Sequence, residues 1–242
     1  MRVLVLSDVH ANLAALNAVL ADAGCFDMIW SLGDVVGYGP DPNACISRLR
    51  EHSHVSVAGN HDWGTLGKLD LADFNPDARH ANLWTRDQLT PESRDYLEAL
   101  PEVLVEGDFT LVHGSPRHPI WEYLLYAGLA KLSFSYYETS TCLVGHTHVP
   151  VVFRDDAESE RCHMMRLPES TVISLDQERC IVNPGGVGLP RDGDPRAAYL
   201  LLDTEGPTIE HRRVAYDIAE TQRRMRSADL SPRNIARLEF GW

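Results

Sequence analysis

The chain has few cysteines, and their arrangement does not suit a structural framework. The five are an odd number, are widely scattered and include no C-x-x-C pair; they are Cys25, Cys45, Cys142, Cys162 and Cys180. A disulfide-stapled fold or a thiolate zinc site is therefore not expected. We interpret these residues as small buried apolar side chains in a reducing compartment.

Long apolar runs are also missing. No stretch of the 242 residues approaches the roughly 20 apolar residues that span a membrane. The N-terminal strand-like segment reaches Asp8 too soon to be the apolar part of a signal peptide. The sequence therefore predicts a cytoplasmic protein without a membrane partner.

Positive charge is scarce as well. The chain has 22 Lys and Arg against 35 Asp and Glu, for a formal net charge of −13. An acidic surface repels DNA and RNA at long range, so no stable nucleic-acid partner is expected. A small phosphate-containing substrate is compatible with this charge, because metal ions can reverse the potential inside one cleft.

The composition, with 44% apolar and 24% charged residues, is ordinary for a globular protein. Neither an internal repeat nor a low-complexity linker divides the chain, so we predict a single domain over residues 1–242.

The first sixty residues alternate between short apolar runs and helical patterns. Strands are predicted at residues 3–7, 28–32 and 55–58, with helices at 12–23 and 43–50 between them. This alternation of strands and helices is typical of a mainly parallel sheet whose polar loops follow the C-terminal ends of the strands.

The rest of the chain is predicted to be helical from about residue 64 to 100, with further helix between 121 and 137. Later strands alternate more clearly and are joined by short turns, which favours a second, mixed or antiparallel sheet. The acidic stretch 155–161 is predicted to be an exposed turn. Two facing sheets with helices outside would accommodate all these elements.

Polar residues gather directly after five of the predicted strands. The clusters are Asp8-Val9-His10, Gly33-Asp34, Gly59-Asn60-His61-Asp62, His113-Gly114 and Gly145-His146-Thr147-His148. Each alone is weak evidence, because a Gly-Asp pair is usually a turn and a single histidine is usually a packing or surface residue. Five such clusters in order, each after an apolar strand, indicate one shared site.

The side chains in these clusters are carboxylate, amide and imidazole groups, which suit Mn²⁺, Fe or Zn²⁺. Seven candidate metal ligands are too many for one ion and suit two ions that share a carboxylate; they are Asp8, His10, Asp34, Asn60, His113, His146 and His148. Paired ions about 3.5–4 Å apart promote in-line displacement at phosphorus and lower the pKa of a bound water. The sequence therefore indicates metal-dependent hydrolysis of a phosphodiester or phosphomonoester.

The ordered set D-x-H, G-D, G-N-H-D, H-G and G-H-T-H resembles the calcineurin-like metallophosphoesterases, and in particular their small bacterial and archaeal phosphodiesterase branch. The motifs extend from Asp8 to His148, and Asn183-Pro184-Gly185 also resembles that branch. The resemblance implies an α/β fold, a four-layer sandwich of two facing mixed β-sheets flanked by helices. It places the metal site at the C-terminal ends of the strands.

The resemblance also implies how the ligands are shared between two divalent ions, of which Mn²⁺ is favoured and Fe, Zn²⁺ or Ni²⁺ are alternatives. The first ion would be held by Asp8, His10 and His148. The second would be held by Asn60, His113 and His146. Asp34 would bridge both ions, and a bridging hydroxide would be the nucleophile.

The same resemblance assigns His61 to contact the phosphate and protonate the leaving oxygen, which fits a group that titrates near neutral pH. Asn60 would touch the substrate as well as the metal. Arg117 and Arg191 could each clamp a phosphate oxygen, although solvated loop arginines are the commoner case. Tyr38 and Tyr123 could stack on a nucleoside or simply pack.

Three positions depart from the family pattern without removing a ligand. Ala11 replaces a common glycine, Asp62 a common glutamate, and Gly186 a common serine. Alternatives within the superfamily are a serine/threonine-type protein phosphatase or a nucleotide phosphatase. A non-catalytic protein-binding scaffold is the alternative from another class, but such a scaffold has little reason to keep all seven ligands and His61. The oligomeric state is open.

Overall fold

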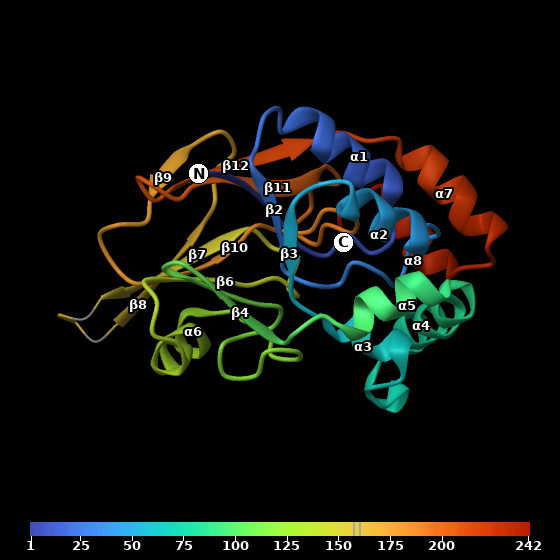
Figure 1. The fold of residues 1–242 in the computed structure, drawn as a ribbon, viewed down its shortest axis with the longest axis horizontal. Helices are drawn as coiled ribbons and strands as arrows, with labels where there is room; N and C mark the ends of the chain where they lie inside the picture. The colour runs from blue at the N-terminus through green and yellow to red at the C-terminus, as the bar shows by residue number, and fades with distance from the viewer. Residues whose placement is uncertain (157, 160) are drawn as a thin grey trace.

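The computed structural model describes residues 1–156, 158–159 and 161–242 and confirms the predicted sandwich of two facing sheets flanked by helices (Figure 1). Each sheet has six strands and contains both parallel and antiparallel pairs. Part of the turn expected at 155–161 lies outside the described residues, at positions 157 and 160.

The first sheet has the order β3-β2-β1-β11-β12-β9. Its strands are β1 (Arg2–Leu6), β2 (Met28–Ser31), β3 (His54–Ser56), β9 (Val172–Ser174), β11 (Ala197–Asp203) and β12 (Thr208–Val214). The three N-terminal strands are parallel, as predicted, and β11 pairs antiparallel with β1. Late strands thus complete the sheet that the first strands begin.

The second sheet has the order β4-β5-β6-β10-β7-β8. Its strands are β4 (Val103–Glu106), β5 (Phe109–Val112), β6 (Thr141–Leu143), β7 (Val151–Asp156), β8 (Arg161–Arg166) and β10 (Cys180–Asn183). The expectation that the later strands form a second sheet together was wrong for β9, β11 and β12. The physical reason lies in β11, which is buried from Ala197 to Leu202 and therefore needs a central place with both faces covered.

The core between the sheets explains why β1 is a continuous apolar run. Val3 and Val5 face the second sheet and pack with residues such as Leu143, while Leu4 and Leu6 face the helices on the other side. Both faces of the strand are buried, so alternation with polar residues is not needed.

The helices lie outside the two sheets and around one end of the sandwich (Figure 1). They are α1 (Leu13–Asp22), α2 (Pro42–Arg50), α3 (Asn60–Leu66), α4 (Pro76–Gln88), α5 (Pro91–Glu98), α6 (Ala127–Ser133), α7 (Ile218–Ser227) and α8 (Pro232–Arg237), with 3₁₀ turns at Leu71–Asp73 and Phe134–Tyr136. The helical segments expected between residues 121 and 137 are α6 and the 3₁₀ turn at Phe134–Tyr136. Among the described residues, no helix has the length and apolar character needed to cross a membrane.

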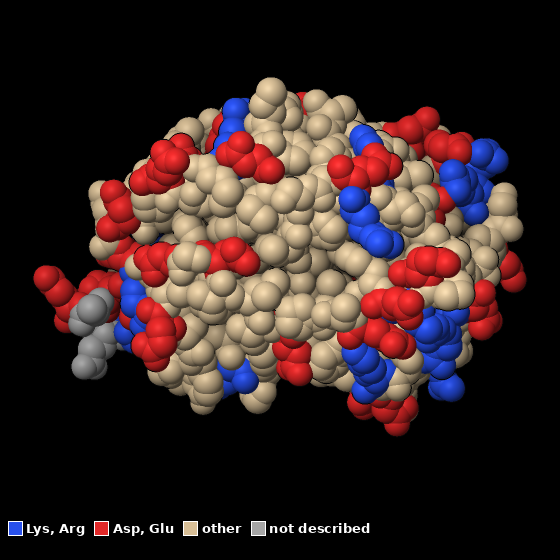
Figure 2. Space-filling view, viewed as in Figure 1, with Lys and Arg blue, Asp and Glu red and all other residues tan. Residues whose placement is uncertain are grey.

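Charged side chains are spread over the visible face of the molecule (Figure 2). Lys and Arg lie interspersed with Asp and Glu there, and the face shows no continuous basic patch. The absence of a stable nucleic-acid partner stays a prediction.

Candidate metal centre

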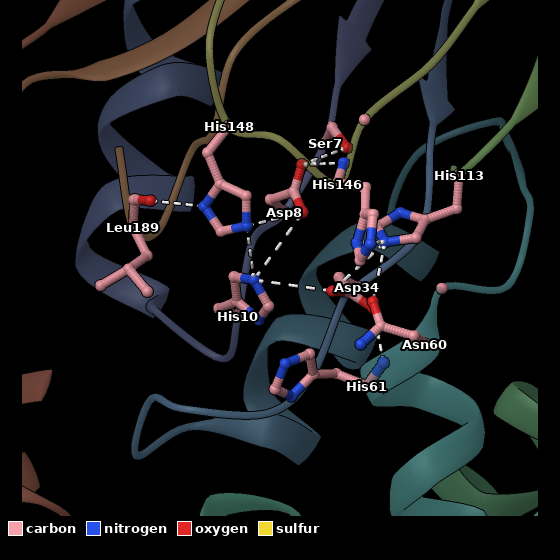
Figure 3. A network of polar contacts seen from close by, with 12 residues as sticks. Ser7, Asp8, His10, Asp34, Asn60, His61, His113, His146, His148 and Leu189 are labelled. Carbon is pink, nitrogen blue, oxygen red and sulfur yellow. Dashed lines mark hydrogen bonds and ion pairs between the residues drawn. The ribbon is translucent and has the colours of Figure 1, made fainter. Parts of the chain in front are cut away.

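The loops that follow β1, β2, β3, β5 and β6 meet at one end of the sandwich and bring the seven predicted ligands together (Figure 3). Each of these side chains is at most 3% exposed. The centre is therefore formed by loops held against the ends of two different sheets.

The backbone at the centre is unusual. Five of the seven predicted ligands have positive φ angles: Asp8 at 55°, His10 at 47°, Asp34 at 52°, His146 at 66° and His148 at 59°. Such conformations cost about 1–3 kcal/mol each in a non-glycine residue and persist only where the surroundings enforce them. Left-handed turns follow β1 and β6. These turns, and not extended strand geometry, direct the side chains of the Asp8/His10 and His146/His148 pairs toward the centre.

The first group of ligands consists of His10, His148 and Asp8. His10 Nδ1 lies 3.1 Å from the carbonyl oxygen of Val36, and His148 Nδ1 contacts that of Leu189. A carbonyl only accepts, so both Nδ1 atoms carry the proton and both Nε2 atoms present bare lone pairs. The two Nε2 atoms are 3.2 Å apart, and Asp8 Oδ1, which has no hydrogen-bond partner, is 3.0 Å from His148 Nε2.

The second group repeats this arrangement with His113, His146 and Asn60. His113 Nδ1 lies 2.8 Å from the Leu32 carbonyl, and His146 Nε2 lies 3.2 Å from the Trp121 carbonyl. The remaining nitrogens, His113 Nε2 and His146 Nδ1, are 3.1 Å apart, and Asn60 Oδ1 is 3.1 Å from His113 Nε2. These atoms again offer lone pairs to a common point.

Asp34 lies between the two groups. Its Oδ2 atom is 3.7 Å from His10 Nε2 and 3.4 Å from His113 Nε2. Its Oδ1 atom accepts a hydrogen bond of 2.8 Å from the backbone nitrogen of His61. One carboxylate oxygen therefore faces both ligand groups, which is the position of a bridging ligand.

The electrostatics of the centre favour added positive charge. Burial lowers the pKa of His10 and His146 well below the usual value, so these rings are neutral ligands near pH 7. Burial also lowers the pKa of His113, but Asp34 more than offsets this and raises it to about 9, so a cation must displace the proton on Nε2 before that nitrogen can bind it. Converging lone pairs beside carboxylates are costly unless a cation lies among them, so the donor set fits two divalent cations.

His61 adjoins this centre. One of its ring nitrogens lies within 4.8 Å of donor atoms of His10 and Asp34. Its Nδ1 is 3.1 Å from Asn82 Oδ1, and its ring centroid is 4.3 Å from that of Tyr38. Burial lowers the pKa of His61 to about 4. Asn82 lies in α4, outside every motif of the sequence, so its contact with His61 could not be predicted from the sequence.

Two buried polar side chains hold the loops of the centre in place. Asp62 accepts hydrogen bonds from the backbone nitrogens of Gly59 and Val36, so it joins the start of α3 to the loop after β2. Asn183 Nδ2 donates to the carbonyl oxygen of Gly145 and to Thr147 Oγ1. Asp62 caps the start of α3. It is also one of the three departures from the family pattern, which commonly has glutamate at this position.

The other two departures also lie at the centre. Ala11 has a φ of 51°, a conformation that glycine adopts without strain. A Cβ atom on Gly186 would lie 3.0 Å from His148 Cβ. A serine there would crowd His148, one of the predicted ligands.

The arginines and tyrosines considered from the sequence have different surroundings. Arg117 forms an ion pair with Glu122, and its role in binding substrate stays a prediction. Arg191 follows Leu189 by two residues, and its buried Nε atom has no hydrogen-bond partner among the described residues. Tyr38 is buried against His61, whereas the ring of Tyr123 stacks on His146 at 3.7 Å and is 41% exposed.

Comparison with known proteins identifies the family. Residues 1–206 match the calcineurin-like phosphoesterase superfamily domain. A protein of Methanocaldococcus jannaschii, MJ0912, is 39% identical over 221 residues, which cover 88% of this chain and 87% of that protein. The chain therefore belongs to the calcineurin-like phosphoesterase superfamily.

Solved structures show the same fold. The crystal structure of a metallophosphoesterase from Sphaerobacter thermophilus has a TM-score of 0.92 and 49% identity, and the match covers 100% of this chain and 99% of that one. The structure of PH1004 from Pyrococcus horikoshii has a TM-score of 0.80 at 22% identity, covering 100% of this chain and 98% of the other, and shows likeness of fold alone.

Proposed function

We propose that this protein hydrolyses a phosphomonoester or phosphodiester bond in a small substrate, with two divalent cations held by the seven residues of the centre. The observation that carries the proposal is the pair of converging lone-pair groups with Asp34 Oδ2 between them. Family membership supports the same reaction class.

The expected cations follow from the donor atoms. Nitrogen and oxygen donors without thiolate suit Mn²⁺, with Fe, Zn²⁺ or Ni²⁺ as alternatives. When bound, two such cations supply an activated water and offset the negative charge that develops on the phosphoryl oxygens.

The chain's own residues orient the reacting groups. The backbone carbonyls of Val36, Leu32, Trp121 and Leu189 fix which nitrogen of each histidine faces inward. Asp34 is held by the backbone of His61 at the start of α3. The arrangement thus preorganises both ligand groups before substrate arrives.

His61 is assigned to proton transfer. With Nδ1 donating to Asn82, the other nitrogen, Nε2, is available to the leaving oxygen. Because burial lowers the pKa of His61 to about 4, its protonation at neutral pH requires the negative charge of a bound phosphate ester beside it. The imidazolium formed in this way can donate its proton as the ester bond breaks.

The decisive experiment measures hydrolysis of p-nitrophenyl phosphate and bis-p-nitrophenyl phosphate by protein that has been exhaustively chelated and dialysed. Turnover should vanish and return when Mn²⁺, Fe²⁺, Zn²⁺ or Ni²⁺ is added singly. His163→Ala removes an exposed histidine of β8 and serves as the control. Its turnover should vanish on metal removal and return on metal addition, as in wild type. Turnover that survives metal removal would refute the proposal.

A further inference from the structure

Among the described residues, Tyr123 is the most exposed aromatic neighbour of the predicted metal ligands. Its ring stacks on the imidazole of His146, with 3.7 Å between the ring centroids and 24° between the planes. Tyr38, which lies edge-on to His10, is 5% exposed, whereas Tyr123 is 41% exposed. One face of the Tyr123 ring therefore covers a predicted ligand, and its exposed surface lies on the side away from that ligand.

The surroundings of Tyr123 hold its ring in place. Glu122, the residue before it, accepts a hydrogen bond of 2.7 Å from Ser115 Oγ. Leu124, the residue after it, is 2% exposed and packs in the core on the outer side of the second sheet. The Tyr123 hydroxyl accepts a hydrogen bond from Arg191. Because the ring is held before a ligand arrives, binding against it requires little further ordering of this side chain.

The Tyr123 ring also lies close to the place where a phosphoryl group would bind. His146 Nδ1 is 3.1 Å from His113 Nε2, inside the second ligand group. Tyr123 lies one stacking distance outside that imidazole. A phosphate ester whose phosphoryl group is at the centre can therefore place its organic substituent against the outer face of the ring.

We propose that the outer face of Tyr123 is a stacking platform that selects phosphate esters with a planar aromatic substituent. This inference rests on the proposed function and deepens it by naming the substrate class. Two aromatic rings attract each other through dispersion and through their quadrupoles, and a saturated ring has no such quadrupole. A benzyl group and a nucleobase both offer a planar aromatic face, so this face is the chemistry that the platform recognises.

The test uses metal-loaded protein and four variants, Tyr123→Leu, Tyr123→Phe, Tyr123→Trp and Tyr136→Leu. Tyr123→Leu keeps an apolar side chain but removes the flat ring, whereas the Phe and Trp variants keep an aromatic face. Tyr136→Leu makes the same change at a tyrosine that is 58% exposed in the 3₁₀ turn Phe134–Tyr136, and it serves as the control. Metal content is measured by elemental analysis for every variant.

The substrates are compared in two pairs, by kcat and KM. Benzyl phosphate is paired with cyclohexylmethyl phosphate; both release a primary alcohol, so the two leaving groups need protonation alike. Adenosine 5′-monophosphate is paired with ribose 5-phosphate, which lacks the base. Phenylphosphonate and cyclohexylphosphonate have no ester bond to hydrolyse, and calorimetry measures how tightly each binds.

Wild-type protein should prefer the planar member of at least one ester pair. The expected preference is about 2- to 10-fold for the benzyl ester and for phenylphosphonate, and about 5- to 100-fold for the nucleotide. Tyr123→Leu should lose most of the preference, mainly through a higher KM, because stacking on the substituent is made in the ground state too. The Phe and Trp variants should keep the preference, and Tyr136→Leu should match wild type. A preference shown by one pair alone identifies the substituent as a nucleobase or as a shorter aryl group.

The outcomes separate this inference from the proposed function. If metal-loaded wild type hydrolyses none of the esters, the proposed function fails. If it hydrolyses them without preferring a planar member, or if Tyr123→Leu keeps the preference, only the stacking role of Tyr123 fails. Loss of metal from Tyr123→Leu would also overturn the inference, because the ring would then serve to support His146. The same holds if Tyr136→Leu loses the preference as fully as Tyr123→Leu.

Discussion

Asp34 lies between the two groups of predicted ligands, with its Oδ2 atom facing both His10 and His113. Asp34→Asn keeps the shape of the side chain but removes the negative charge that offsets repulsion between two dications. At saturating metal, its turnover should fall below that of His10→Ala by about tenfold or more. Steady-state kinetics of the two variants, at equal metal content, provide the comparison. Equal losses would argue against a bridging carboxylate.

His61 has a different expected role, since it is assigned to the proton and the phosphate and not to the metal. His61→Ala should keep about two metal ions per chain and lose about 10²–10⁴-fold in turnover on an alkyl phosphate, whose leaving group needs a proton. The loss should shrink with nitrophenyl esters, because nitrophenolate departs without protonation.

Two results would contradict this assignment of His61. Loss of metal in the variant would make the residue a ligand or a structural support. Near-normal turnover on alkyl esters, with metal retained, would leave it as a side chain that packs against Tyr38 and Phe74.

At the level of elements, the start of α3 is pressed against the loop after β2. A Cβ atom on Gly59 would collide with Asp34 Oδ1 and with the Asp34 backbone nitrogen. Gly59→Ala should therefore displace Asp34, lower metal content and destabilise the protein by about 1–3 kcal/mol. Thermal unfolding and elemental analysis measure both effects.

Gly128 in α6 provides the control for this substitution. A Cβ atom there meets only the Tyr126 ring, at 3.6 Å. Because alanine is the better helix former, Gly128→Ala should leave metal content unchanged and stabilise the protein by roughly 0.5–1 kcal/mol. If Gly59→Ala behaved in the same way, the close approach of α3 to Asp34 would not matter for the centre.

For the whole molecule, His211 in β12 links stability to pH. Burial and, to a lesser extent, the positive charge of Arg213 lower its pKa from 6.5 to about 4. Between these values the unfolded chain binds a proton that the folded chain does not, so stability falls as pH drops from about 6.5 to about 4. The loss attributable to His211 should be on the order of 2–3 kcal/mol.

Urea unfolding at pH 4.5, 5.5 and 7 tests this linkage. The fall in unfolding free energy should be smaller in His211→Gln, which has no titrating ring at that position. His163→Gln removes a histidine that is 64% exposed, and its pH profile should follow wild type. An unchanged slope in His211→Gln would mean that other groups set the acid sensitivity.

The sequence by itself determined where the chemistry lies along the chain. A short apolar run followed by polar residues is a local pattern. It therefore predicted the strands before Asp8, Asp34 and Asn60, and the residue types show which donor atoms follow each strand. The ordered motifs also predicted the four-layer sandwich, through their resemblance to the calcineurin-like metallophosphoesterases.

The tertiary structure alone decided how distant segments meet. Nothing local in Ala197–Asp203 shows that this strand pairs with β1 as well as with its neighbour β12, because the pairing with β1 is a long-range contact. The carbonyls of Leu32 and Leu189, far along the chain from His113 and His148, decide which imidazole nitrogen is bare. Hydrogen bonds and charges act through space, so their partners become known only when the chain has folded.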